Sequence, residues 1–148
     1  MLAVETMQTS YTPGSFAKEL ASSSHALDTF GCVDVALGLD DDEAGTSLEW
    51  RMGNRCDKSV ATDPSSLVVT AIVPNEPETL VALADPELVA RELEPRRTAF
   101  DRVALSLPAG TERVCVSYFN VVTSAATRER QPACFERKRG WILARGRT

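Results

Sequence analysis

The chain has 148 residues, a formal net charge of -5, 43% hydrophobic residues and 25% charged residues. This length suits one domain with a substantial core, and the acidic balance disfavours nucleic acid as a partner, because binding phosphate needs a surplus of basic residues. No apolar run approaches the ~18–20 residues that a membrane-spanning helix requires, so we expect no transmembrane segment.

Residues 1–30 are expected to form an N-terminal arm. The stretch Ser10–Ser15 is rich in turn residues, Ser22–Ser24 is small and polar, and Ser15–Ala21 between them suits one or two helical turns. The start Met1–Glu5 lacks the basic and apolar regions of a signal peptide. Because the cysteines discussed below indicate an oxidising compartment, either a leader has been removed, which we favour, or export follows another route, or the cysteines are reduced.

Short β segments separated by turn residues begin at Gly31. In Cys32–Leu39, Val33, Val35 and Leu37 alternate with small or polar residues, and this period of two indicates a half-buried strand. In Ser47–Met52 the same alternation involves Trp50, which is therefore expected in the core.

Further β segments follow at a spacing of about 8–12 residues, which is typical of a sandwich. They are Lys58–Thr62, Ser66–Val73, Thr79–Leu83, Phe100–Leu107, Arg113–Val122, Ala133–Glu136 and Gly140–Ala144. Glu87–Leu93 fits neither period, and Leu107–Thr111 is predicted to be a hairpin turn. The pattern predicts an all-β fold, an antiparallel β-sandwich (immunoglobulin-like, about 7–9 strands) over residues 31–136. Residues 137–148 follow as a basic C-terminal tail or a last strand.

Four cysteines, Cys32, Cys56, Cys115 and Cys134, are present without the close spacing of a metal site. An even number without metal spacing indicates two disulfides in a chain that works outside the reducing cytoplasm. The favoured pairing is Cys32–Cys56 with Cys115–Cys134, because each pair flanks one excursion of the chain. The rival pairing Cys32–Cys115 would place Trp50 between the two cysteines, as in an immunoglobulin core.

Motifs for catalysis or cofactor binding are missing from the sequence. There is one histidine, His25, and there is no glycine-rich phosphate loop, no H-E-x-x-H and no G-x-S-x-G. We expect no catalytic residue, no cofactor and no metal. The run Asp40–Glu43 is expected to be a solvated acidic turn, although a calcium-binding cluster is the alternative.

The C-terminal end of the chain is basic, with seven basic and two acidic residues from Arg128 onward. Such a segment is either a solvated tail or a docking element for an acidic partner. The candidate partner-binding residues are Trp141, Arg137, Lys138, Arg139, Arg145 and Arg147. For Trp141, core and interface positions both remain open.

Three stretches of the chain carry a resemblance. Trp50–Val60, which contains Gly53-Asn-Arg-Cys-Asp57, precedes the stretch Ser66–Thr70, and Val114-Cys-Val116 comes later. Over about Gly31–Phe135 this resembles uncharacterised secreted or lipoprotein-type proteins of myxobacteria and related Gram-negative bacteria. The resemblance implies a cell-envelope β-sandwich with paired cysteines, and it implies no activity.

These features together predict a non-enzymatic β-sandwich subunit that is periplasmic or extracellular, or associated with the outer membrane. Its expected partners are proteins, either other subunits of an envelope assembly or copies of itself. A carbohydrate- or surface-ligand-binding module and a carboxylate-dependent hydrolase are the alternative functions.

Overall fold

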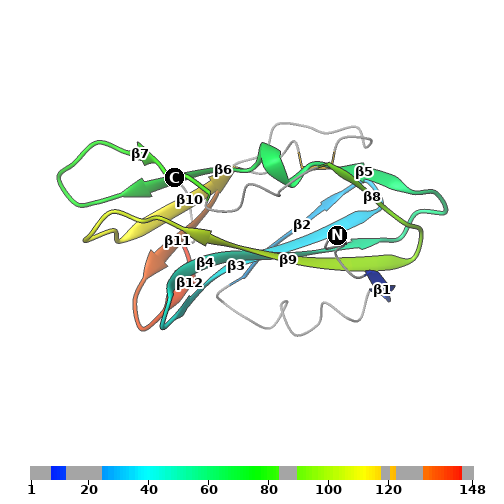
Figure 1. Cartoon of the computed structure of the whole chain (residues 1–148), viewed down its shortest axis with the longest axis horizontal. Coiled ribbons are helices and arrows are strands. Elements are labelled where there is room, and N and C mark those ends of the chain that lie inside the picture. Colours follow the sequence, from blue (N-terminus) through cyan, green and yellow to red (C-terminus); the bar gives the residue numbers. More distant parts are fainter. Residues whose placement is uncertain (1–7, 13–24, 84–89, 118–120, 123–131, 145–148) are drawn as a thin grey trace, which may run out of the picture.

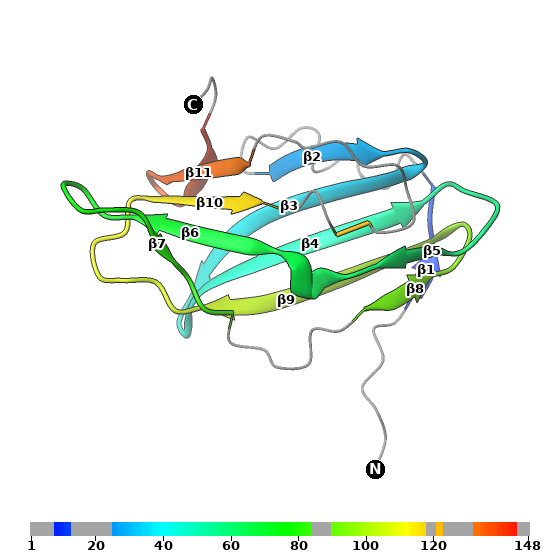
Figure 2. The ribbon, with the colours of Figure 1, turned by 90° about the horizontal axis from the view of Figure 1, so that it is seen from above.

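The chain folds into two antiparallel sheets that pack face to face (Figures 1 and 2). The computed structural model describes residues 8–12, 25–83, 90–117, 121–122 and 132–144. Within these ranges it has twelve strands, which confirms the all-β class and the sandwich architecture. The strands are more numerous than expected because several are only two or three residues long.

The first sheet consists of β1 (Gln8–Ser10), β2 (His25–Phe30), β3 (Val33–Asp42), β4 (Gly45–Asn54) and β9 (Arg97–Leu105). Their order across the sheet is β1-β9-β4-β3-β2. β3 and β4 form a long hairpin in which Val33 lies opposite Asn54 and Asp42 lies opposite Gly45. The expected strands at Cys32–Leu39 and Ser47–Met52 are confirmed, and both are longer than predicted.

The second sheet consists of β6 (Val68–Ile72), β7 (Thr79–Leu80), β10 (Arg113–Ser117), β11 (Ala133–Arg137) and β12 (Trp141–Leu143). Their order is β12-β11-β10-β6-β7. A small third sheet pairs β5 (Val60–Thr62) with β8 (Arg91–Leu93), which settles the ambiguous stretch before Leu93 as a strand over its last three residues. A 3₁₀ turn at Pro64–Ser66 separates β5 from β6.

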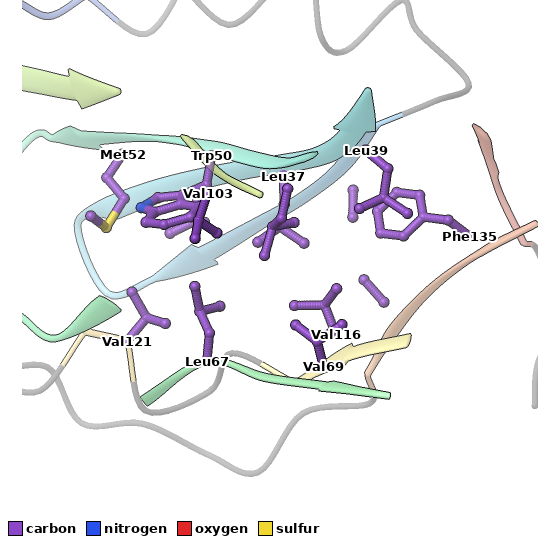
Figure 3. Packing of buried hydrophobic residues seen from close by; sticks show 14 of the residues in the cluster. Leu37, Leu39, Trp50, Met52, Leu67, Val69, Val103, Val116, Val121 and Phe135 are labelled. Carbon is purple, nitrogen blue, oxygen red and sulfur yellow. The ribbon is translucent and has the colours of Figure 1, made fainter. Parts of the chain in front are cut away.

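The core lies between the two sheets, where alternate residues of each strand meet (Figure 3). Leu37 and Trp50 from the first sheet are 1% and 2% exposed. Val69 and Val116 from the second sheet lie across from Leu37, and Leu67 lies across from Trp50. This follows from the period of two, because every second side chain of a strand points to the same side of the sheet. Each fully buried large apolar side chain contributes roughly 1.5–3 kcal/mol.

The segment Leu107–Thr111 is not a hairpin turn. β9 belongs to the first sheet, where it pairs with β4, whereas β10 pairs with β6 and β11 in the second sheet. The segment therefore carries the chain from one sheet to the other. A local turn signal does not reveal this, because the partners of both flanking strands are distant in the sequence.

The N-terminal arm is shorter than predicted. All of β2 pairs with β3, from His25 opposite Gly38 to Phe30 opposite Val33, and Phe30 is fully buried. β1 pairs with β9 and forms an edge of the same sheet. Residues 25–30 therefore belong to the sandwich, while the expected helical turns at Ser15–Ala21 lie outside the described residues. The last-strand alternative for the C-terminal segment is correct for β12.

Replacing Phe30 with alanine should lower the free energy of unfolding by about 3–5 kcal/mol, because it removes a fully buried ring from the core. The matched control is Phe100→Ala, since Phe100 is 48% exposed on β9; its expected loss is no more than about 1 kcal/mol. Urea denaturation of the two variants measures both values. Equal losses would contradict the placement of β2 in the core.

Candidate functional site

The four cysteines form two neighbouring pairs. Cys32 lies with Cys56, with their Cα atoms 5.4 Å apart, and Cys115 lies with Cys134, with their Cα atoms 4.0 Å apart. This is the favoured pairing from the sequence. Two such pairs indicate a chain that works outside the reducing cytoplasm.

Each cysteine pair joins neighbouring strands of a single sheet. Cys115 and Cys134 are directly opposite each other on β10 and β11. Cys32 precedes β3 and Cys56 follows β4, and the amide of Arg55 donates a hydrogen bond of 2.8 Å to the carbonyl of Cys32. The rival pairing Cys32–Cys115, which would place a disulfide between the two sheets as in an immunoglobulin domain, is therefore wrong for this chain.

Trp141 of β12 is a core residue. It is 4% exposed and belongs to the main apolar cluster between the sheets. The prediction of Trp141 as a partner-contacting side chain is therefore corrected. Its ring packs inward because it lies directly opposite Arg137 at the inward-facing end of β11, whereas Ile142 on the other side of the strand is exposed.

Asp41 joins the two sheets beside Trp141. Its Oδ1 accepts a hydrogen bond of 3.1 Å from Trp141 Nε1 and another from the Thr46 hydroxyl. Its Oδ2 accepts a hydrogen bond of 2.8 Å from Arg137 Nη1, and the Arg137 guanidinium lies 4.4 Å from the centre of the Trp141 ring. Burial raises the pKa of Asp41, but these hydrogen bonds and the Arg137 charge outweigh burial and hold the pKa below 3.8. We call Asp41, Thr46, Arg137 and Trp141 the cross-sheet clamp.

The acidic run Asp40–Glu43 is exposed from Asp41 onward, but most of its carboxylates are paired. Arg102 of β9 lies 3.0 Å from Asp40 and 2.9 Å from Asp42, and Arg137 lies 2.8 Å from Asp41, so two arginines pair with three of its carboxylates. Most of the run extends β3, and the turn itself falls at Glu43 and Ala44. In the described ranges no three histidine, cysteine or acidic side chains cluster as a metal site would require.

Two of the predicted partner-binding residues, Lys138 and Arg139, lie in the turn between β11 and β12. Lys138 and Arg139 are exposed, and among the described residues neither side chain forms a hydrogen bond or an ion pair. Arg137 is also exposed, but it is held by the clamp. Arg145 and Arg147 lie outside the described residues.

A shallow pocket opens beside this turn and has a volume of about 260 Å³. It is lined by Ile72, Pro74, Glu112, Arg113, Glu136, Arg137 and Lys138. Arg113 and Glu136 form an ion pair of 3.0 Å across β10 and β11. Among the residues that line the pocket, Arg113 and Arg137 are paired with carboxylates, whereas the Lys138 ammonium forms no ion pair with a described residue.

Tyr11 forms a contact that no sequence pattern predicts. Its ring lies directly over Gly53 of β4, where any Cβ would overlap it, and its hydroxyl donates a hydrogen bond to Asp34. Arg55 binds the same carboxylate with two hydrogen bonds of 2.9 and 3.0 Å. Burial and the Asp34 contact raise the pKa of Tyr11. Gly53 therefore leaves the space that the Tyr11 ring occupies. The sequence feature that could have indicated this contact is a glycine within a β pattern, because such a glycine often marks the close approach of another group.

Asn54 is the other residue whose role the sequence concealed. The dipeptide Gly53-Asn54 is by its sequence a tight-turn signal that would end the preceding strand. Asn54 is instead the last residue of β4 and is completely buried. Its side-chain amide donates to the carbonyls of Lys58 and Leu93, both at 2.9 Å, and its Oδ1 accepts from the amide of Cys56. Asn54 therefore ties the small third sheet to the end of the first sheet.

Both tryptophans and Tyr11 are buried, and Phe100 is the one exposed aromatic residue in the described ranges. No helix in the part of the chain that the structure covers has the length and apolar character needed to cross a membrane. Comparisons of the chain with models of protein families, with curated proteins and with solved structures found no match.

Non-reducing peptide mapping should find the bonds Cys32–Cys56 and Cys115–Cys134 and no free thiol. The expectation follows from the positions of the pairs, since Cys32 and Cys56 meet where β3 begins and β4 ends, and Cys115 and Cys134 are opposite each other on β10 and β11. A crossed bond such as Cys32–Cys115, or four free thiols, would contradict the structure.

The Asp41→Asn variant should have a weaker dependence of stability on pH than the wild type. Because the folded pKa of Asp41 lies below its ordinary value of 3.8, its charge stabilises the fold above that pH. This stabilisation is lost as the pH falls through the folded pKa. Urea denaturation of both proteins, from neutral pH to below the ordinary carboxyl pKa, measures the difference. If the free energy of unfolding changes with pH equally in both proteins, protonation of Asp41 does not affect the stability that the clamp provides.

Proposed function

We propose that this chain is a non-enzymatic β-sandwich subunit that acts by binding proteins in the cell envelope or outside the cell. The observation that carries the proposal is the β11–β12 turn, where the exposed Lys138 and Arg139 stand beside a pocket on a rigid base. The clamp supplies that base, because Arg137 and Trp141 fasten the turn to Asp41 of the other sheet.

The charge of the turn favours an acidic partner. Lys138 and Arg139 are free of competing carboxylates among the described residues, whereas the chain as a whole is acidic, with a net charge of -5. A local basic element on an acidic protein orients an acidic partner toward that element. The two cysteine pairs support an envelope or extracellular setting, since such bonds persist where the surroundings are oxidising.

The alternative of a carbohydrate-binding module receives less support. Sugar rings commonly stack on exposed aromatic side chains, yet Trp50, Trp141 and Tyr11 are all buried. Phe100 on the outer side of β9 is a single such position and lies within reach of Arg51, whose guanidinium is 5.9 Å from its ring.

Reversing the charge of the turn with Lys138→Glu should reduce recovery of the partner several-fold and weaken its dependence on salt, because a rim charge steers association. The matched control is Lys58→Glu, an exposed lysine in the β4–β5 connection. The measurement is affinity purification of the full tagged chain from its native source, with quantitative mass spectrometry of the recovered proteins. Equal recovery with both variants would overturn the proposal for this turn.

A further inference from the structure

We propose that the outer face of the second sheet is an interface between two copies of this chain. The inference rests on the proposed function as a protein-binding subunit and adds a surface with a specific partner. This surface shares Ile72, Arg113 and Glu136 with the lining of the pocket beside the β11–β12 turn. The face consists of the side chains of β6, β7, β10, β11 and β12 that point away from the core.

The register of the strands arranges this face in rows. In one row Ile72, Arg113, Glu136 and Ile142 lie side by side across four strands. In the next row Leu80 and Thr70 lie beside the Cys115–Cys134 pair.

Exposed apolar side chains concentrate on this face. Four large hydrophobic residues are exposed in the described part of the chain, and Val68, Leu80 and Ile142 are on this face at 46%, 78% and 38%. The fourth, Phe100, lies on the other sheet. Leu80 and Ile142 stand on opposite edge strands, and the partly exposed Ile72 and Cys115–Cys134 pair lie between them. Apolar surface therefore extends across the face, and an extended exposed apolar patch is typical of a surface that binds another protein.

The outer faces of the two sheets differ in net charge. This difference favours another copy of the chain as the partner that binds the outer face of the second sheet. On the first sheet the outward positions of β3, β4 and β9 include four carboxylates and two arginines, a balance of -2. They are Asp34, Asp40, Asp42, Glu49, Arg51 and Arg102. On the second sheet the outward strand positions hold one arginine and one glutamate, a balance of zero. Two copies that each carry -5 therefore repel least when they meet through the second sheet.

The single ion pair on this face is also self-complementary. In a twofold dimer the same patch is used by both subunits, so a residue i that contacts j is matched by j contacting i. Arg113 of one copy can then face Glu136 of the other while the pair of 3.0 Å within each copy is kept. A strongly acidic or basic partner would find no net charge here to bind.

The size of the face predicts a weak dimer. Five strands about 4.8 Å apart and up to five residues long, at about 3.3 Å per residue, cover roughly 400 Å². Two such faces fall short of the ~1,200 Å² at which standard interfaces begin. The expected dimer therefore dissociates readily and forms at high concentration.

Sedimentation equilibrium of the full chain, with its disulfides intact, tests the proposal between about 10 μM and about 1 mM, the range suited to weak association. The wild type should pass from monomer to dimer. Leu80→Ser should weaken the dimer about tenfold or more, because it removes an exposed apolar side chain from the face. The matched control Phe100→Ser should leave it unchanged. A wild type that stays monomeric, or equal effects of the two variants, would overturn the proposal.

Charge exchange provides a second test. Arg113→Glu alone should weaken the dimer, and the double variant Arg113→Glu with Glu136→Arg should restore it, because the face is then self-complementary again. Failure of the double variant to restore the dimer would count against the twofold arrangement.

Amide chemical shifts of the wild type, recorded over the same concentrations, keep the test independent of any variant. Shifts confined to the strands of the second sheet support the interface, and shifts confined to β3, β4 and β9 overturn it.

The dimer interface and the binding of the acidic partner can be tested separately. If Lys138→Glu loses the acidic partner while the dimer is unchanged, the two interactions use different residues. Retention of a different protein through Leu80 by a monomeric chain would assign the face to that protein instead.

Discussion

Burial of one face of each sheet against the other is the interaction on which the rest of this structure depends. Val33, Val35 and Leu37 of β3 point into the same space as Val114 and Val116 of β10, and all are almost fully buried. This packing requires the two sheets to hold a defined separation and orientation. The cross-sheet clamp acts at one end of that packing, where the Asp41 carboxylate of the first sheet is bound by Trp141 and Arg137 of the second.

The same alternation that builds the core also determines what the two outer faces present to their surroundings. The outer face of the first sheet carries charged side chains and the Tyr11 contact, in which Asp34 is bound by Tyr11 and by Arg55. The outer face of the second sheet is nearly free of charge and carries the Cys115–Cys134 pair among aliphatic residues. The first surface thus suits water and the N-terminal segment, whereas the second is the surface that we propose to bind another copy. The basic β11–β12 turn stands at the edge of the second surface, so the two proposed binding surfaces lie close together.

The residues that join distant parts of the chain are mostly polar. Asn54 holds the third sheet, Asp41 holds the second sheet, and Asp34 holds Tyr11. Each forms hydrogen bonds with groups that are far away in the sequence, and the fully buried Asn54 has its side-chain amide satisfied in this way, as burial of polar groups requires. When their distant partners are not known, such residues are predicted to lie in turns or on the surface. The local sequence therefore indicates a tight turn at Asn54 and a solvated turn at the run that contains Asp41.

The sequence by itself determined the β class, the inward-facing residues of the longer strands, the position of Trp50 in the core and the favoured cysteine pairing. These depend on the period of two and on short separations along the chain, which are local properties. Only the tertiary structure decided that Leu107–Thr111 crosses between sheets, that His25–Phe30 is a strand, that Trp141 is buried and that Gly53 receives Tyr11. Those outcomes depend on which strands become neighbours, and strand order is determined by packing between residues that are far apart in the sequence.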